Sequence, residues 1–289
     1  MKDFWKTNIK IGISTLLAVF CTASWSAEKP LNLAILMPAP AKIIHKNWQP
    51  LADYLSTALG KTVHISTPRN LEQARTSLGD ADFVYANAYL YAILADEFQI
   101  TPIAQMRNTG NSVLSRGRFL VRNDSNITSI KDLKGKKIAL ISRFGAGSYL
   151  APRASLAREG LDIEKDVTVE FTNNLKKAAY MVMLGEADTA VMCEVNYEIL
   201  SKRIDTGDLK FFDTTEQFPE AIMFTPHKQD SEIAKLFKKA ILADSARKNE
   251  ALRSLNEMKI GNFIEFDPAI MIQLNKLIRQ AGLTKIDGT

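Results

Sequence analysis

Short apolar segments alternate with helical segments along this chain of 289 residues, and this alternation limits the possible folds more than any other feature. Residues 31–37 form a nearly continuous apolar run that ends at Pro38, and residues 43–59 then repeat apolar side chains at helical spacing. Further strands are expected at 63–66 and 82–85, with a helix at 71–78 between them. Regular alternation of this kind is typical of an α/β protein in which helices cover a largely parallel sheet.

A second unit of the same kind begins near Arg118. Its expected strands and helices are 119–121, 137–141, 149–159 (helix), 167–171, 175–184 (helix) and 189–192. The chain then leaves this unit through residues 209–212 and reaches a return strand at 221–224. Three helical stretches close the sequence, near 233–243, 246–259 and 269–281. The sequence therefore predicts two α/β units and a helical C-terminal segment.

The first 26 residues have the order of a secretory signal peptide. Lysines occur in the first ten residues, uncharged and largely apolar residues follow at 11–23, and the small residues Ser24 and Ser26 come last. The apolar run is shorter than the roughly 20 residues that a membrane-spanning helix needs. We therefore expect cleavage after Ser26 and export of the mature chain, from Ala27 onward, to the periplasm.

Charge, cysteine content and histidine spacing disfavour several function classes. The formal net charge of +5 falls to +3 once the signal peptide is removed, and basic residues are interleaved with acids, unlike the basic stripe of a nucleic-acid-binding protein. Cys193 remains as a lone thiol in an apolar strand, which is typical of a core residue. His45, His64 and His227 are scattered, without metal-ligand spacing or a nucleophile motif. The sequence predicts no nucleic-acid partner, no metal, no cofactor and no catalytic residue.

The loops that follow the strands are the places to look for a ligand. In open sheets of this type, ligands bind beyond the carboxyl ends of the strands. These loops span residues 38–42, 85–88, 142–149, 172–175 and 194–197. Within them, the glycine-rich turn 145–148 joins a strand to a helix. This turn indicates either a loop that binds a ligand or only the point where the strand ends and the helix begins.

Four motifs occur in an order that resembles a known family. They are RFLVRNDSNITSIKDLKGKKIA at 118–139, WQPLADYL at 48–55, YLAPR at 149–153 and GEAD at 185–188. Together they resemble the phosphate-, phosphite- and phosphonate-binding proteins that serve ABC transporters. The resemblance implies a two-lobed periplasmic binding protein of type II, a Venus-flytrap fold with mixed, mostly parallel sheets. It implies a first lobe at 27–115, a second lobe at 116–215 and a return to the first lobe at 216–289, which includes the C-terminal helices.

The resemblance also implies a ligand pocket, which this chain alters. The family's Ser-Thr-Ser-Gly turn binds an oxyanion at a helix start, whereas this chain has Gly-Ala-Gly-Ser at 145–148. Leu175 stands where the family has a histidine, and Asn70 lies near the place of an expected tyrosine. Two acids fall near positions that contact the amino group of some ligands. The candidate ligand-binding residues are Tyr85, Asn87, Gly145, Ala146, Gly147, Ser148, Tyr149, Asn173, Asn174, Glu194 and Glu220.

Three functions fit these observations. The first is capture of a small-molecule ligand and its delivery to an ABC permease in the inner membrane, with altered specificity, because the lost hydroxyls and histidine should weaken phosphonate binding. The second is presentation of the ligand to a sensor histidine kinase in that membrane. The third is transport of a bulkier organic or lipid-like solute. In each case we expect a monomer that closes on its ligand and is not an enzyme.

Overall fold

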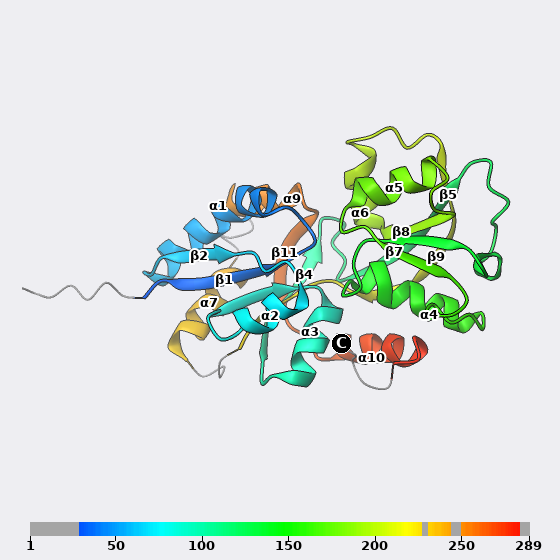
Figure 1. Ribbon diagram of the computed structural model, residues 1–289. Coiled ribbons are helices and arrows are strands. Elements are labelled where there is room, and N and C mark those ends of the chain that lie inside the picture. The colour runs from blue at the N-terminus through cyan, green and yellow to red at the C-terminus, as the bar shows by residue number, and fades with distance from the viewer. Residues whose placement is uncertain (1–28, 227–230, 244–249, 284–289) are drawn as a thin grey trace, which may run out of the picture.

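The computed structural model describes residues 29–226, 231–243 and 250–283. The expected signal peptide and His227 therefore lie outside the described residues, as does the start of the helix expected at 246–259. Within the described ranges, the protein consists of two lobes side by side, each built on its own sheet (Figure 1). None of the helices in these ranges is long and apolar enough to cross a membrane.

The first lobe is built on a six-stranded sheet with the order β11-β4-β10-β3-β1-β2. Its strands are β1 (Leu31–Leu36), β2 (Val63–Ser66), β3 (Phe83–Ala86), β4 (Thr101–Asn108), β10 (Ile222–Thr225) and β11 (Ile260–Glu265). Its helices are α1 (Ala41–Leu59), α2 (Leu71–Ser77), α3 (Ala88–Glu97), α7 (Glu232–Leu242) and α9 (Glu250–Asn256). Gly60 ends α1 in the left-handed conformation, as expected for a helix stop.

The second lobe is built on a five-stranded sheet with the order β7-β6-β8-β5-β9. Its strands are β5 (Leu114–Arg122), β6 (Lys137–Leu140), β7 (Thr168–Phe171), β8 (Thr189–Cys193) and β9 (Leu209–Pro219). Its helices are the 3-10 helix η1 (Ile130–Leu133), the π-helix η2 (Ala146–Leu150), α4 (Ala151–Arg158), α5 (Leu175–Met183) and α6 (Glu194–Ser201).

The α/β class and the two mixed sheets confirm the expected fold, but parallel pairing does not dominate. The pairs β1–β2, β1–β3, β6–β7 and β6–β8 are parallel. Antiparallel pairs are more numerous among the described strands: β3–β10, β4–β10, β4–β11, β5–β8 and β5–β9. The reason is that strands next to the two crossovers between the lobes run against their neighbours, and hydrophobic periodicity does not report strand direction.

The lobe boundaries differ in detail from the expected ones. The second sheet begins with β5 at residue 114 and ends with β9 at residue 219, slightly outside the expected 116–215. The C-terminal helix α10 (Ala269–Gln280) follows β11 of the first lobe, yet it packs against α4 and β9 of the second lobe. The C-terminal segment therefore connects the lobes, whereas we expected it to belong to the first lobe alone.

Two strands were not expected from the sequence. The segment that forms β4 contains Pro102, Gln105 and Arg107, and the segment that forms β11 contains Gly261, so neither has a strong strand pattern. β4 pairs with β10 on one side and with β11 on the other, and β11 pairs with β4. Their strand conformation thus depends on the neighbouring sheet more than on local preference.

The core of the first lobe lies between its sheet and helices α1, α7 and α9. Trp48 of α1 is fully buried there, and its ring centroid lies 4.6 Å from that of Tyr85. Phe83 of β3 stacks on Phe237 of α7 at 3.6 Å. The indole Nε1 of Trp48 is buried and has no hydrogen-bond partner among the described residues. Trp48 therefore contributes through its apolar contacts.

We predict that Trp48→Ala lowers the free energy of unfolding by about 3–5 kcal/mol, because it leaves a cavity in this core. Trp48→Phe keeps most of the ring contact and loses no hydrogen bond, so it should cost much less. Urea unfolding followed by circular dichroism measures both. A loss below about 1 kcal/mol for the alanine variant would show that Trp48 does not anchor the first lobe.

Candidate functional site

The lobes meet where the loop after β3 faces the loop after β6. Asn87 caps α3, and its Oδ1 accepts hydrogen bonds from the backbone N–H groups of Tyr89 and Leu90, both at 3.1 Å. Its Nδ2 donates to the carbonyl of Phe144 in the second lobe at 3.1 Å. The expected site residue Asn87 therefore lies at the junction of the lobes and bridges them.

The glycine-rich turn opens the π-helix η2, and two of its polar groups have partners within the protein. Gly145 is the N-cap of η2, and its backbone N–H donates to the carbonyl of Ser142 at 3.4 Å. The hydroxyl of Ser148 donates to the same carbonyl at 3.0 Å. Ala146, Gly147 and Ser148 are all buried. The turn lies at the expected place, but its hydroxyl already has a protein partner.

Gly147 is held in a close contact between two other elements. A Cβ atom added there would lie closer to the Sγ of Cys193 and the Cζ of Phe218 than real Cβ atoms approach such atoms. Cys193 ends β8, and Phe218 lies near the end of β9. Glycine is needed here because side chains of the protein occupy the adjacent space.

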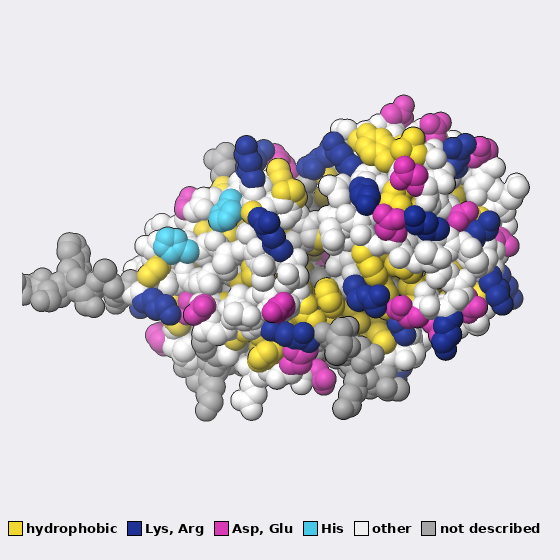
Figure 2. Space-filling model, in the orientation of Figure 1, with side chains coloured by type: hydrophobic (Ala, Val, Ile, Leu, Met, Phe, Trp, Pro, Cys, Tyr) yellow, Lys and Arg dark blue, Asp and Glu magenta, His cyan; other side chains and the backbone are white. Residues whose placement is uncertain are grey.

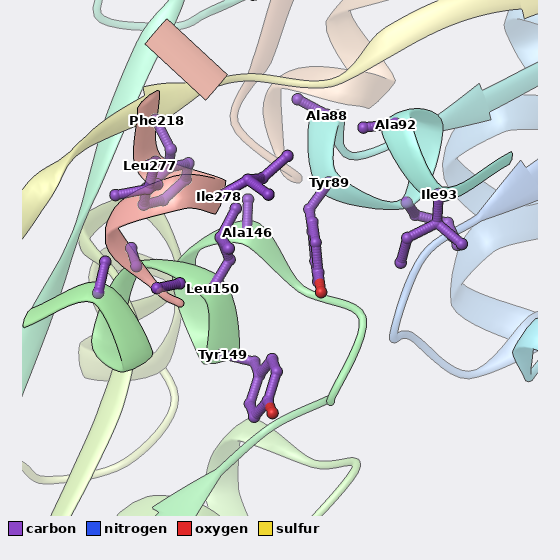
Figure 3. Packing of buried hydrophobic residues seen from close by; sticks show 14 of the residues in the cluster. Ala88, Tyr89, Ala92, Ile93, Ala146, Tyr149, Leu150, Phe218, Leu277 and Ile278 are labelled. Atoms are coloured by element: carbon purple, nitrogen blue, oxygen red, sulfur yellow. The ribbon is translucent and has the colours of Figure 1, made fainter. Parts of the chain in front are cut away.

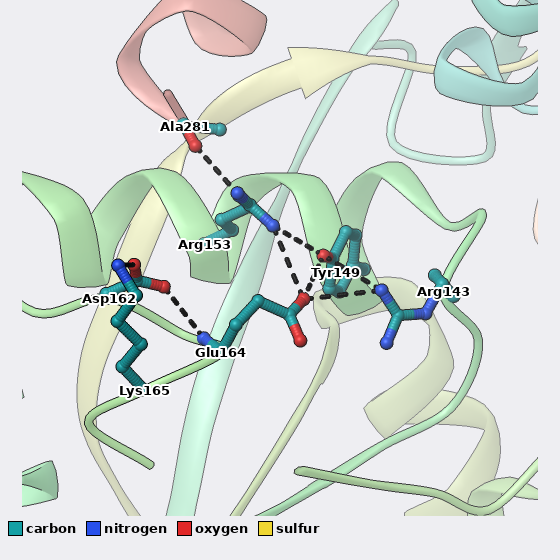
Figure 4. A network of polar contacts seen from close by, with 7 residues as sticks. All are labelled: Arg143, Tyr149, Arg153, Asp162, Glu164, Lys165 and Ala281. Atoms are coloured by element: carbon teal, nitrogen blue, oxygen red, sulfur yellow. Dashed lines mark hydrogen bonds and ion pairs between the residues drawn. The ribbon is translucent and has the colours of Figure 1, made fainter. Parts of the chain in front are cut away.

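The two expected aromatic site residues do not point to a common site. Tyr85 is buried in the core of the first lobe, where its hydroxyl lies 3.0 Å from the Sδ of Met106, and burial raises its pKa well above the usual value. Tyr149 points away from Ala146 (Figure 3) and toward a network on the second lobe (Figure 4). There its hydroxyl donates to Glu164 at 2.8 Å and accepts from Arg153 at 2.7 Å.

The expected asparagines lie at the carboxyl end of β7 and are exposed. Asn173 adopts a left-handed conformation with φ of 51°. Asn174 caps α5, and its Oδ1 accepts from the backbone N–H of Lys177 at 3.1 Å. Leu175, in the place of the family's histidine, is the first residue of α5 and is partly buried. This edge of the second lobe thus offers amide groups to a ligand, with Asn173 the less constrained of the two.

The acid Glu220 lies at the crossover from β9 to β10, between the two sheets. Its Oε1 accepts a hydrogen bond from the Nδ2 of Asn108 at 2.9 Å. Burial raises its pKa to about 6, and the Asn108 hydrogen bond only partly opposes this rise. The charge of Glu220 also contributes to the raised pKa values of Tyr85 and Cys193. Glu220, Tyr85 and Cys193 are therefore close enough to interact electrostatically.

The other expected acid, Glu194, begins α6 and forms an ion pair with Arg118. The guanidinium of Arg118 also lies over the ring of Phe211, 4.8 Å from its centroid. One turn further along α6, Glu198 forms an ion pair with Lys259 of the first lobe. This inter-lobe pair could not be predicted from local sequence patterns, because 61 residues separate its partners.

Cys193 does not have the properties of a reactive thiol. Burial, followed by the charge of Glu220, raises its pKa to about 12, so the thiol stays protonated at neutral pH. We expected a core cysteine; the side chain is partly buried and packs on the apolar cluster that contains Ala146 and Phe218. Among the described residues, no group of three or more His, Cys, Asp or Glu side chains could hold a metal ion.

Two polar grooves lie on the first lobe. One, of about 520 Å³, follows β2 and is lined by residues of the loop to α2 and of α2 itself, including Asn70. The other, of about 400 Å³, lies beside the crossover from β4 to β5 and includes Asn108, the partner of Glu220. Figure 2 shows acidic and basic side chains interspersed over both lobes, without a continuous basic stripe on this face.

The chain matches a known protein family and resembles solved structures. Residues 34–270 match the model of a family described as ABC transporter, phosphonate, periplasmic substrate-binding protein. A solved binding-protein component of an ABC phosphonate transporter from Pseudomonas aeruginosa has a TM-score of 0.75 at 16% identity, over 88% of this chain and 87% of that one. At this identity, the likeness concerns the fold.

Two curated relatives match this chain over different shares of their own length. The tetrathionate sensor histidine kinase TtrS of Salmonella typhimurium is 30% identical over 174 residues, which cover 58% of this chain and 29% of the kinase. The phosphate-import protein PhnD of Mycolicibacterium smegmatis is 22% identical over 218 residues, covering 68% of this chain and 66% of that protein. The chain therefore spans less than a third of the kinase and just under two thirds of the import protein.

We predict that Glu220 makes stability fall as pH rises. Its pKa in the folded protein is about 6, above the ordinary 4.5, so the folded state binds the proton more tightly than the unfolded state. Stability should decrease between about pH 4.5 and pH 6.5, by up to about 2 kcal/mol. Urea unfolding across this range should show the decrease in the wild type and lack it in Glu220→Gln. The exposed Glu186→Gln serves as control, and an unchanged profile in Glu220→Gln would contradict the assignment.

We also predict that Gly147→Ala destabilises the second lobe by about 1–3 kcal/mol, because the added methyl overpacks the contact with Cys193 and Phe218. Cys193→Ala in the same chain should restore part of the loss, which a double-mutant cycle measures. Gly79→Ala is the matched control, since its Cβ would have an ordinary contact at 3.6 Å. Additive effects of the Gly147 and Cys193 changes would contradict the contact.

Proposed function

The chain belongs to the family of periplasmic substrate-binding proteins of phosphonate-type ABC transporters, and from this premise we propose that it captures a small solute other than a phosphonate between its lobes. It delivers this solute to an ABC permease in the inner membrane. The mature protein begins at Ala27, after removal of the signal peptide, and works as a monomer. The proposal includes no catalytic step, and the protonated thiol of Cys193 is consistent with that.

The observation that carries the altered specificity is the state of the Gly145–Ser148 turn. An oxyanion site at a helix start needs hydroxyl and backbone N–H donors directed at the ligand. Here the Ser148 hydroxyl and the Gly145 N–H both donate to the carbonyl of Ser142. Ala146 and Gly147 bring no hydroxyl, and Phe218 and Cys193 pack against Gly147. A phosphonate dianion at this turn would lose several hydrogen bonds, at a cost of several kcal/mol.

The side chains of Glu220 and Glu194 favour a ligand that carries a positive charge or hydrogen-bond donors. Glu220 is partly desolvated, has one amide partner and has a raised pKa, so a ligand ammonium beside it would recover much of the free energy that burial costs. Glu194 could exchange its ion pair with Arg118 for a ligand group. We propose Glu220, Glu194, Asn87 and Asn173 as polar contacts, with the Gly145–Ser148 turn and Tyr149 as the adjoining wall. Asn174 then acts by capping α5, and Tyr85 by packing in the core of the first lobe.

A sensor role is the second candidate, and the match to TtrS favours it. The matching part covers 29% of that histidine kinase, so a related segment occurs inside a signalling protein. In this case the closed, ligand-bound form would act on a membrane histidine kinase and not on a permease. Stimulation of ATP hydrolysis by a reconstituted transporter, or of autophosphorylation by a reconstituted kinase, distinguishes the two partners.

We predict that methylphosphonate and phosphate bind weakly or not at all to the exported protein in calorimetry at neutral pH. Native mass spectrometry of the same preparation should reveal a different, retained solute. With that solute, small-angle scattering should show a modest contraction, as closure of two lobes requires. Sub-micromolar affinity for either anion would overturn the altered specificity, and an unchanged scattering profile at saturation would overturn capture by closure.

A further inference from the structure

The polar groove beside the β4–β5 crossover has an unusual set of lining groups. Its volume is about 400 Å³, and no acid among the described residues lines it. Apart from the backbone at Gly261, it is lined by a guanidinium, a hydroxyl and carboxamides, from Arg107, Asn108, Thr109, Asn111, Asn256 and Asn262. A groove with one fixed positive charge, many hydrogen-bond donors and no negative charge is electrostatically suited to an anion.

The backbone around the groove is shaped to bring β11 close to β4. A β-bulge interrupts the pairing of these strands between Ile260 and Asn262. At Gly261, an added Cβ would lie 2.7 Å from the carbonyl oxygen of Asn108, so only glycine allows this approach. Bulges of this kind re-aim side chains at the edge of a sheet. Here the bulge places Asn262 beside Arg107 of the neighbouring strand.

Arg107 has unused hydrogen-bonding capacity at this point. Its Nη1 donates to the Oδ1 of Asn111 at 3.1 Å, which fixes the guanidinium from one side. Its Nε is buried and has no partner among the residues that the structure describes. A buried N–H group without an acceptor is costly, and more so when it belongs to a charged group. An acceptor at the groove would remove this cost.

The other lining groups divide into fixed and available ones. Asn108 is fixed, because its Nδ2 donates to Glu220 and its Oδ1 accepts from the backbone N–H of Ser112 at 3.1 Å. The side chains of Asn256, Asn262 and Thr109 line the groove, and within the part of the chain that the structure describes they form no side-chain hydrogen bond. Their amide and hydroxyl donors can complete the coordination of an anion that Arg107 anchors.

We propose that this groove is a binding site for a small oxyanion, such as a carboxylate, sulfate or phosphate group, with Arg107 as its charged anchor. The planar guanidinium offers parallel N–H donors that match the oxygens of such groups. The bound anion joins the β4–β5 crossover to β11 and α9. The groove adjoins the proposed solute site only through Asn108, which donates to Glu220. The tests below follow Arg107 and Asn262, so their failure would leave the proposed solute capture untouched.

The direct test follows the Arg107 Nε–H signal by NMR while sodium sulfate or sodium acetate is added to the exported protein at constant ionic strength. We expect a saturable shift of this signal for at least one anion. Arg107→Lys removes the signal and so assigns it. Absence of a saturable shift with both anions overturns the proposal.

Variants separate a specific site from general charge effects. Arg107→Gln should weaken anion binding, measured by calorimetry, at least about tenfold, which is the scale of one lost charged hydrogen bond. Arg107→Lys keeps the positive charge but loses the parallel N–H donors of the guanidinium, and Asn262→Ala removes one amide donor. Both variants should therefore weaken anion binding by smaller factors. The matched control Arg203→Gln removes an exposed charge from the second lobe and should have no effect. The proposal is overturned if wild type and Arg107→Gln bind the anion equally well. It is also overturned if Arg107→Gln and Arg203→Gln lose the same amount of affinity. If Arg107→Gln fails to fold, the affinity of Asn262→Ala and the NMR titration decide.

Discussion

The apolar core that the two lobes share is the constraint on which the rest of the structure depends. Tyr89 of α3, Ala146 of η2 and Leu277 of α10 belong to one continuous cluster of buried side chains (Figure 3). Polar contacts surround it: Asn87 donates to the Phe144 carbonyl, and Arg153 donates to the carbonyl of Ala281. Because burial of apolar surface is the main favourable term in folding, this cluster fixes how α3, η2 and α10 lie against one another.

The shared core also decides what chemistry the turn before α4 can perform. With Ala146, Gly147 and Ser148 buried, donors at this turn must find partners inside the protein, and Ser142 supplies one. The polar groups with fewer hydrogen-bond partners lie elsewhere, at Glu220 and along the groove that contains Arg107. In the function that we propose, charge recognition therefore lies at the crossovers between the lobes and not at this helix start.

Local patterns predicted the elements of both lobes, but not the direction in which side chains point. The helix at 41–59 has a strong apolar face and a glycine stop, so sequence spacing was sufficient. Tyr85 and Tyr149 both follow the pattern of a ligand-facing aromatic, yet one packs on Trp48 and the other joins Arg153 and Glu164. Their orientation is set by contacts from distant parts of the chain. The strands β4 and β11 were missed for the same reason, since their conformation depends on β10 and on each other.

The inter-lobe ion pair between Glu198 and Lys259 bears on the lobe closure that we propose. The side chain of Glu198 is 52% exposed and that of Lys259 is 18% exposed, so water still screens the pair, which contributes on the order of 1 kcal/mol. It therefore cannot hold α6 against the first lobe without help. Lys259 adopts a left-handed conformation with φ of 63°, which is unfavourable for a residue with a side chain. A ligand changes such a balance only by the difference between its affinities for the two arrangements. Because the pair adds so little, most of the free energy of the closure that we propose must come from the ligand, while the shared apolar core keeps the lobes attached.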